Sequence, residues 1–169
     1  MKRIAATLLY LLAAAVARLP WPVLHALGDG VAWLWRRLDA REARVARRNL
    51  ALAMPALDPG ERERLQREVL RTTARQALET LVFWTRPHRR NLALIREQHG
   101  TDLFDAAIAS GRGVIVAAPH YGNWELLNQW LAARTPLAIL YRPPESAIGE
   151  LFLQRVRAAS HWFSSSQLP

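Results

Sequence analysis

His120 and Glu125 are the residues whose types and spacing point most directly to chemistry. In a continuous α-helix of 3.6 residues per turn, side chains five positions apart point about 140° away from each other. The two side chains can therefore meet only if the chain bends between them. Pro119 and Gly122 supply such a bend, and Asn123 is a favourable N-cap for a helix that follows it.

The segments on either side of the bend would position His120 and Glu125. Residues 114–118 form a short apolar run, which predicts a buried strand. His120 would then lie in a strand-to-helix loop, and Glu125 in the first helical turn, where the helix dipole favours an ionised carboxylate. A histidine oriented by a carboxylate at the carboxyl end of a strand suits a general base. A loop histidine beside a capping carboxylate is the alternative that the residues alone leave open.

A second apolar run follows the helix predicted over residues 123–134. It covers residues 137–141 and is closed by Arg142 and two prolines. Two strands joined through a helix predict a right-handed parallel βαβ unit, with His120 and Arg142 at the carboxyl ends of neighbouring strands. Such an arginine either faces solvent or holds a phosphate or a developing negative charge beside the base.

Helical patterning dominates most of the remaining chain. Asp58, Pro59 and Glu61 start a helix whose apolar stripe extends to about residue 84. The shorter predicted elements are a strand over 92–97, helices over 102–110 and 146–160, and a frayed tail over 164–169. The predicted fold class is α/β, in which N-terminal membrane-associated helices (residues 1–57) precede a partial parallel sheet with flanking helices (residues 58–169).

The composition is apolar and strongly basic. Hydrophobic residues make up 51% of the 169 residues, and residues 1–57, with nine basic and three acidic side chains, carry +6 of the net charge of +9. This combination suggests an anionic partner, either lipid head groups or nucleic acid. No nucleic-acid motif accompanies the arginines, so we expect no nucleic-acid partner. Cysteine is absent and the histidines lack metal-ligand spacing, so we expect no metal site.

The N-terminal apolar segment covers residues 4–17 without a charge. As a helix it would reach roughly 21 Å, short of the roughly 30 Å hydrocarbon core of a bilayer. It fits a signal peptide, a buried core helix or an uncleaved membrane anchor. Residues 19–35 favour the anchor because they remain mostly apolar and contain three tryptophans, and an arginine-rich stretch follows at residues 36–48. A soluble helical layer with a solvated arginine face is the alternative.

The segment from His120 to Glu125, H-Y-G-N-W-E, resembles the H-x-x-x-x-D/E box of the glycerolipid acyltransferases. Its form is that of the bacterial lipid A late acyltransferases, the lauroyl and myristoyl transferases of lipopolysaccharide assembly. The N-terminal apolar segment resembles the membrane anchor of that family, and the likeness extends to about residue 157. The other matching segments are Arg47-Arg48-Asn49-Leu50 with Met54-Pro55, Leu78-Glu79, Gly111-Arg112-Gly113-Val114-Ile115 and Tyr141-Arg142-Pro143.

The resemblance implies an acyltransferase that needs no cofactor. His120 would take the proton from a hydroxyl of the acceptor, and Glu125 would hold the imidazole. The donor would be the thioester of acyl carrier protein. The acceptor would be a lipid A precursor or a related glycolipid at the cytoplasmic face of the inner membrane. The residues implied to bind substrate are Asn123, Arg142 and Arg157, with Arg155 as the alternative to Arg157.

The resemblance also implies a difference in length. Members of the family are longer, with further strands and an Asp-Gln region, and residues 160–166 do not resemble their continuation. We therefore expect a C-terminally truncated chain whose incomplete sheet leaves an open strand edge. The alternative function is that of a catalytically inactive remnant that binds anionic lipid at a membrane surface.

Overall fold

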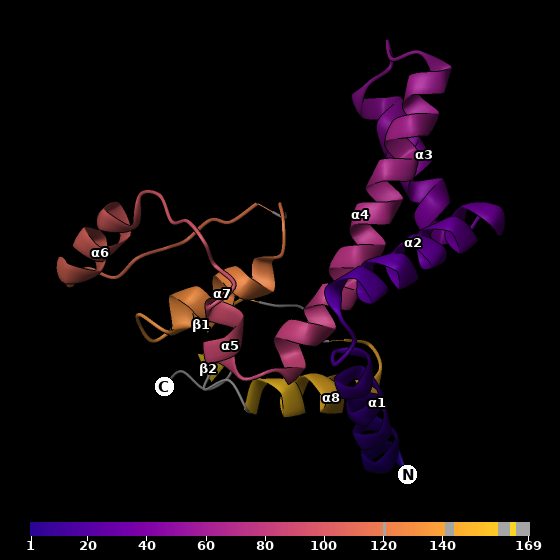
Figure 1. The fold of residues 1–169 in the computed structure, drawn as a ribbon. Coiled ribbons are helices and arrows are strands. Elements are labelled where there is room, and N and C mark those ends of the chain that lie inside the picture. Colours follow the sequence, from indigo (N-terminus) through magenta and orange to yellow (C-terminus); the bar gives the residue numbers. More distant parts are fainter. Residues whose placement is uncertain (120, 141–143, 159–162, 165–169) are drawn as a thin grey trace. The chain divides into compact units, whose positions relative to one another are not determined.

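The computed structural model describes residues 1–119, 121–140, 144–158 and 163–164 (Figure 1). These residues are mostly helical, and they divide into two compact units that we treat separately: the helical unit, residues 15–82, and the site unit, residues 1–14 with 83–169. The elements are α1 (Lys2–Val16), α2 (Trp21–Arg37), α3 (Arg41–Ala53), α4 (Pro59–Thr85), α5 (His88–Leu92), α6 (Thr101–Ala109), α7 (Trp124–Ala132), β1 (Ala138–Ile139), α8 (Ala147–Ala158) and β2 (Phe163–Ser164).

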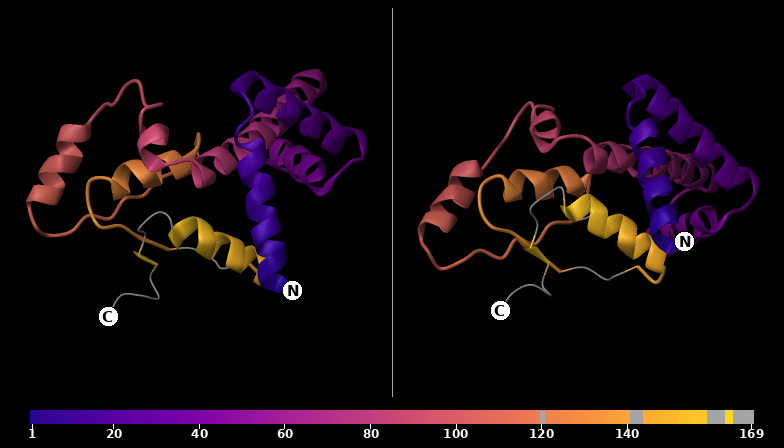
Figure 2. Two further views of the ribbon diagram at one scale, coloured as in Figure 1. Left: turned by 60° about the horizontal axis from the view of Figure 1, so that its bottom comes forward. Right: turned by 90° about the horizontal axis from the view of Figure 1, so that it is seen from below.

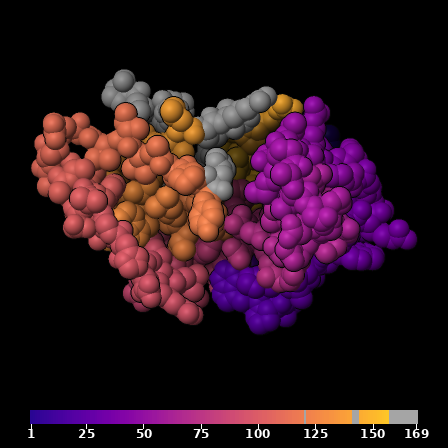
Figure 3. Space-filling model, turned by 90° about the horizontal axis from the view of Figure 1, so that it is seen from above, coloured from indigo at the N-terminus to yellow at the C-terminus, as the bar shows by residue number. Residues whose placement is uncertain are grey.

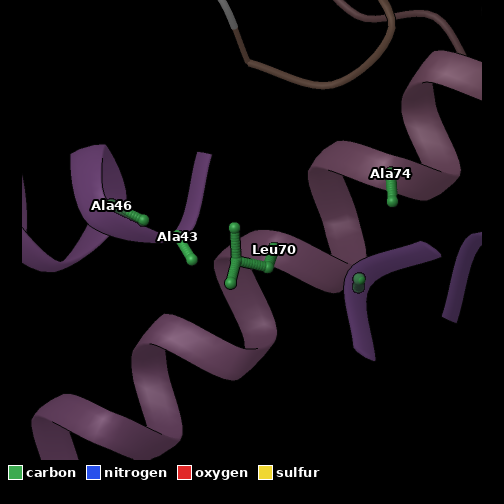
Figure 4. Close-up of a cluster of buried hydrophobic side chains, with 5 residues drawn as sticks. Ala43, Ala46, Leu70 and Ala74 are labelled. Atoms are coloured by element: carbon green, nitrogen blue, oxygen red, sulfur yellow. The ribbon is translucent and has the colours of Figure 1, made fainter. Parts of the chain in front are cut away.

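Small residues form much of the core of the helical unit. Its buried cluster joins α2, α3 and α4, and the members are Ala32, Ala43, Ala46, Leu70 and Ala74 (Figure 4). Alanine side chains let helix axes approach closely, and Gly28 of α2 takes this further against Arg75 of α4. A Cβ added at Gly28 would lie 3.0 Å from the Cα atom of Arg75. The packing of α2 on α4 therefore requires a residue without a side chain at this position.

Polar contacts tie the same helices together. Asp29 of α2 accepts two hydrogen bonds of 2.7 Å from the guanidinium of Arg75, and Arg71 donates to the same carboxylate at 3.1 Å. These arginines hold the pKa of Asp29 at about 2. Between α3 and α4, the buried amide of Gln66 donates to the carbonyl of Ala43 at 2.8 Å. Each contact satisfies a polar group that close helix packing would otherwise remove from water.

In the site unit, α1 and α8 lie side by side in both views of Figure 2. The rings of Tyr10 and Phe152 have centroids 6.4 Å apart, and Phe152 also meets Trp84, at the end of α4, at 5.6 Å. Arg155 donates to the hydroxyl of Thr7 at 3.0 Å. Phe152 is only 6% exposed, so it is the main apolar anchor between these segments.

The predicted helices are confirmed within the described residues, with boundaries shifted by a few residues; residues 159–160, at the end of the helix predicted over 146–160, lie outside them. The long helix predicted from residue 58 is α4, and the Asp58 carboxylate accepts hydrogen bonds from the backbone N–H groups of Gly60 and Glu61. The helix predicted over residues 102–110 is α6. Local capping and an apolar stripe were sufficient to predict these elements, because both act within a few residues of the helix itself.

The α/β class is not confirmed, and two of the predicted strands are wrong. Residues 93–97 follow the short helix α5 without forming a strand, and residues 114–118 pair with no other described segment. The run over 114–118 is apolar, but Ile115 is 97% exposed. A strand needs a neighbour to share its hydrogen bonds, and an apolar run alone does not supply one.

The strand predicted over residues 137–141 is confirmed only at Ala138–Ile139, since residues 141–143 lie outside the described residues. It pairs in parallel with β2, in the register Ala138 to Phe163 and Ile139 to Ser164. Helix α8 connects the two strands. A βαβ connection is therefore present, but β1, α8 and β2 form it, so that only its first strand belongs to the predicted unit.

No single helix among the described residues is long and apolar enough to cross a bilayer; α1 and α2 meet that criterion of length and composition only when taken together as a bent pair.

Candidate functional site

The chain bends between residue 119 and helix α7, as the sequence predicts. The backbone N–H of Tyr121 donates to the carbonyl of Pro119 at 2.8 Å, and Gly122 has a φ of 67°. This left-handed conformation is open to glycine without the clash that a Cβ would cause. Tyr121 is 90% exposed, and side chains of this part of the chain, coloured salmon to orange, lie at the surface in Figure 3. The bend therefore faces outward.

Asn123 starts helix α7 in the predicted way. Its backbone is extended, with φ −91° and ψ 95°, and its side-chain oxygen accepts a hydrogen bond of 3.3 Å from the N–H of Glu125. Such a cap satisfies one of the four N–H groups that lack partners at a helix start. Capping occupies this side-chain oxygen. The role of Asn123 in substrate binding remains a prediction.

Glu125 lies in the first turn of α7 and is only 2% exposed. Burial of a carboxylate is unfavourable unless nearby donors or positive charges compensate for the lost water. The N-terminal end of the helix offers part of this compensation through its dipole. A buried acidic side chain at the start of a surface helix differs from an ordinary solvent-exposed cap. This burial favours a functional interpretation of the residue.

The other predicted site residues are His120, Arg142 and Arg157, with Arg155 as the alternative to Arg157. His120 and Arg142 lie outside the described residues. The backbone of Arg157 belongs to α8, but its side chain is likewise outside them. The alternative, Arg155, contacts α1, where its guanidinium lies 4.9 Å from the centre of the Tyr10 ring. The structure thus brings Asn123 and Glu125 together, and the pairing of Glu125 with His120 stays a prediction.

Two buried amides near Glu125 were missed by the sequence analysis. Asn91 of α5 is fully buried and Gln129 of α7 is 2% exposed. The amide nitrogen of Asn91 donates to the side-chain oxygen of Gln129 at 2.9 Å, and both side chains donate to the carbonyl of Phe83. The spacing could have indicated Gln129, because this residue follows Glu125 by four positions and therefore shares its helix face.

A pocket of about 370 Å³ lies beside the start of α7. Its lining combines the apolar side chains of Ile95, Leu126, Leu127 and Trp130 with the polar side chains of Gln98, His99, Thr101 and Asn123. Trp130 is held in place because its indole N–H donates to the side-chain oxygen of Gln98 at 2.6 Å. A pocket lined by both kinds of side chain suits an amphipathic ligand, with an apolar part and a few polar groups.

A wider hollow of about 700 Å³ is bounded by the segment 113–118, by α6 and α7 and by β1. Most of its lining is aliphatic, with Phe104 at the α6 side. No group of three His, Cys, Asp or Glu side chains in the described part of the chain has an arrangement that could hold a metal ion. The described surroundings of α7 thus combine one buried carboxylate with apolar space.

Comparison with known proteins shows the family of this chain. The family model for the bacterial lipid A biosynthesis acyltransferases matches residues 1–161. The chain belongs to this family. The match covers the bend, helix α7 and the N-terminal helices, so the H-x-x-x-x-E segment lies inside the matched region.

Individual relatives agree with the family. The chain is 30% identical over 144 residues to the lipid A biosynthesis palmitoleoyltransferase of Escherichia coli, which is 85% of this chain and 47% of the relative. It is 29% identical over 133 residues to the lipid A biosynthesis lauroyltransferase of the same organism, 79% of this chain and 43% of the relative. A shorter match, 49% identical over 35 residues, joins 21% of the chain to 11% of the phosphatidylinositol mannoside acyltransferase of Mycobacterium tuberculosis. The chain spans about half the length of the two lipid A relatives.

Proposed function

We propose that this member of the lipid A acyltransferase family transfers a fatty acyl chain from acyl carrier protein to a hydroxyl of a lipid A precursor or a related glycolipid. The observation that carries the proposal is the burial of Glu125 in the first turn of α7, directly after a bend at Gly122. The family membership supports the reaction class, and the mostly aliphatic hollow bounded by residues 113–118, α6, α7 and β1 supports a hydrocarbon substrate.

The reaction is a direct transfer. His120 accepts the proton of the acceptor hydroxyl while its oxygen attacks the thioester carbonyl carbon. The new C–O bond forms, the C–S bond breaks, and the proton passes from the imidazolium to the departing thiolate sulfur. Glu125 orients the imidazole. It also stabilises the positive charge of the imidazolium between proton uptake from the hydroxyl and proton release to the thiolate. Asn123, Arg142 and Arg157 contribute to substrate binding, and the two arginines suit the phosphates of acceptor and carrier.

The test is transfer of radiolabelled acyl chains from acyl carrier protein to a lipid A precursor by membranes that contain the protein. We expect His120→Ala to lower the rate roughly 10²- to 10⁴-fold, the usual contribution of a positioned acid or base. Glu125→Gln should also lower the rate of transfer. His25→Ala is the control, because His25 lies in the helical unit, where it bonds Glu79, and lines neither of the two pockets described above. An unchanged rate for His120→Ala would show that another group acts as the base.

The protein also has surfaces that suit a membrane, which supports the proposal of a location at the inner membrane. In the site unit, one face of α1 carries four large aliphatic side chains that are between 55% and 66% exposed: Ile4, Leu8, Leu11 and Leu12. Lys2 and Arg3 lie at the start of this helix. The four aliphatic positions repeat at helical spacing and form one stripe. An apolar stripe beside basic residues is typical of a helix that lies in the interface of an anionic bilayer.

The helical unit has a similar stripe on α2 and its C-cap residue, Leu38. Its five members are spaced by three or four residues and are between 37% and 68% exposed: Val23, Leu27, Val31, Leu34 and Leu38. Arg36 and Arg37 lie in the last turn of the helix, between Leu34 and Leu38. Arginine side chains near an apolar surface favour anionic lipid head groups. These stripes favour a second candidate function, in which the protein binds anionic membranes without catalysing transfer.

Flotation with vesicles of phosphatidylglycerol and phosphatidylethanolamine tests this second candidate. Leu8→Asp combined with Leu12→Asp should reduce the floated fraction, and a pair of aspartates in the α2 stripe should do the same. Leu52→Asp combined with Leu103→Asp is the control, because these leucines are 72% and 74% exposed on α3 and α6. Flotation of a parent protein that transfers no acyl chain would favour the non-catalytic function. Equal flotation of all variants would remove the membrane role of both stripes.

A further inference from the structure

The end of α4 is where the polar network of the site unit begins. This helix ends at Thr85, so its last four carbonyl groups, that of Phe83 among them, lack partners within the helix. Phe83 is only 5% exposed, and a buried carbonyl without a donor is unfavourable. The amides of Gln129 and Asn91 supply donors, at 2.7 Å and 3.0 Å from the Phe83 oxygen. The end of α4 is thus capped by side chains from two other helices.

This cap also fixes the orientation of α7. The Gln129 side chain is held at both ends, since its nitrogen donates to Phe83 and its oxygen accepts from Asn91 at 2.9 Å. Asn91 belongs to α5, which packs against α7. A rotation of α7 about its axis, or a shift along it, would break two hydrogen bonds that no water can replace at a fully buried position. The network therefore restricts both movements.

Glu125 is placed by the same constraint. It lies one helical turn before Gln129 on the same face of α7, and both side chains are 2% exposed. An α-helix is stiff over a single turn, so a helix fixed at Gln129 is fixed at Glu125 as well. The Asn123 cap orders the first turn, in which Glu125 lies, by a local hydrogen bond.

We propose that Gln129 and Asn91 are positioning residues, which dock α7 onto the carbonyl end of α4 and so hold the Glu125 carboxylate in the orientation that the reaction needs. The inference rests on the proposed function, because it assigns a task to Glu125. It adds that part of the catalytic geometry is set by the C-terminus of a helix outside the H-x-x-x-x-E segment. A displacement of about 1 Å in such a group can lower a rate about 10²-fold.

The test uses the full chain and a signal that does not require turnover. The ring protons of His120 are followed by NMR as the pH is changed, and His120→Gln identifies them among the five histidines. A carboxylate held against an imidazole raises its pKa above the usual value of about 6.5. Glu125→Gln should therefore lower the His120 pKa by roughly one unit. This first comparison tests the proposed pair itself.

The positioning role is tested by Gln129→Met, which keeps the length of the side chain but removes its amide, and by Asn91→Leu. Each variant should retain the helical circular dichroism spectrum and lower the His120 pKa by at least half of the shift that Glu125→Gln produces. Gln154→Met is the matched control, because Gln154 is an exposed glutamine on α8. It should leave the His120 titration unchanged. A purely structural amide would lower the melting temperature without moving this pKa.

The outcomes separate the two proposals. If Glu125→Gln moves the His120 pKa and neither amide variant does, the positioning role is refuted and the proposed pair stands. If Glu125→Gln has no effect, the pair is refuted and the positioning role fails with it. If both amide variants lose the helical spectrum, the network serves the fold rather than the orientation of Glu125, and the inference is overturned.

Discussion

Gly28 and Gly30 provide a matched pair of substitutions in the middle of α2. Gly28 lies against α4, where a Cβ would come within 2.9 Å of Cγ, 3.0 Å of Cα and 3.1 Å of N of Arg75. At Gly30 nothing lies within 4 Å of the same added atom. Both residues are inside one helix and two positions apart. Replacement of either by alanine therefore changes the helix propensity equally, and only one replacement introduces a clash.

The magnitudes follow from these distances. Glycine to alanine in a helix interior stabilises by about 0.5–1 kcal/mol, so Gly30→Ala should raise the free energy of unfolding by that amount. At Gly28 the same gain is opposed by overpacking, typically about 1–3 kcal/mol. The clash is with backbone atoms of α4, and the Arg75 side chain is already fixed by its paired hydrogen bonds to Asp29. We expect a net destabilisation of about 1 kcal/mol for Gly28→Ala.

Urea denaturation followed by circular dichroism measures both variants against the parent. The difference between the two variants cancels the propensity term and isolates the clash, so it should be about 1–3 kcal/mol. For a chain of this size each kcal/mol corresponds to a melting shift of roughly 2–4 °C. Equal stability of Gly28→Ala and Gly30→Ala would refute the close packing of α2 on α4. Gly28→Val should then also be tolerated, whereas the described geometry excludes it.

Three further predictions concern single side chains. The Arg75 and Arg71 guanidiniums lower the pKa of Asp29 from 3.8 to about 2, so its stabilising contribution is complete above about pH 4 and is lost as the pH falls through about 2. The difference in stability between the parent and Asp29→Asn, measured by acid titration at fixed urea, should shrink over that interval, and a constant difference would contradict this account. Phe152→Ala should cost about 3–5 kcal/mol and abolish much of the near-ultraviolet circular dichroism signal; a loss below 1 kcal/mol would show that the ring is not a core group. Gln66→Leu removes the side-chain hydrogen bond to the Ala43 carbonyl, which keeps its donor within α3, and should cost about 0.5–1.5 kcal/mol in urea denaturation; no measurable effect would contradict this account.

Much of the site's local structure could be predicted from short-range patterns. Asp58 and Asn123 were recognised as helix caps because a cap acts on N–H groups two or three residues away. The bend at Gly122 was predicted from the same few residues, and its positive φ confirms it. The position of Glu125 in the first turn of α7 follows directly from these signals. The family was also recognised from this segment, since H-x-x-x-x-E is a continuous motif.

The strands and the amide network could not be predicted in this way. The apolar run over residues 114–118 suggested a strand, but pairing depends on a neighbour that local hydrophobicity does not specify. Gln129 and Asn91 are separated by 38 positions, and neither residue type indicates burial by itself. Their contact depends on how α5 and α7 pack against each other, which neither segment specifies alone.

The sequence by itself determined the helices and the bend before α7, because these depend on backbone preferences and capping over a few neighbouring residues, and it supplied the pair of residue types that the proposed chemistry uses. Only the tertiary structure decided that Glu125 is buried, that two amides dock its helix onto the end of α4, and that Gly28 admits no side chain. These properties arise from contacts between segments distant in the chain. Their free energy depends on how closely the segments approach and on which water is excluded between them, and neither quantity is set by any one segment alone.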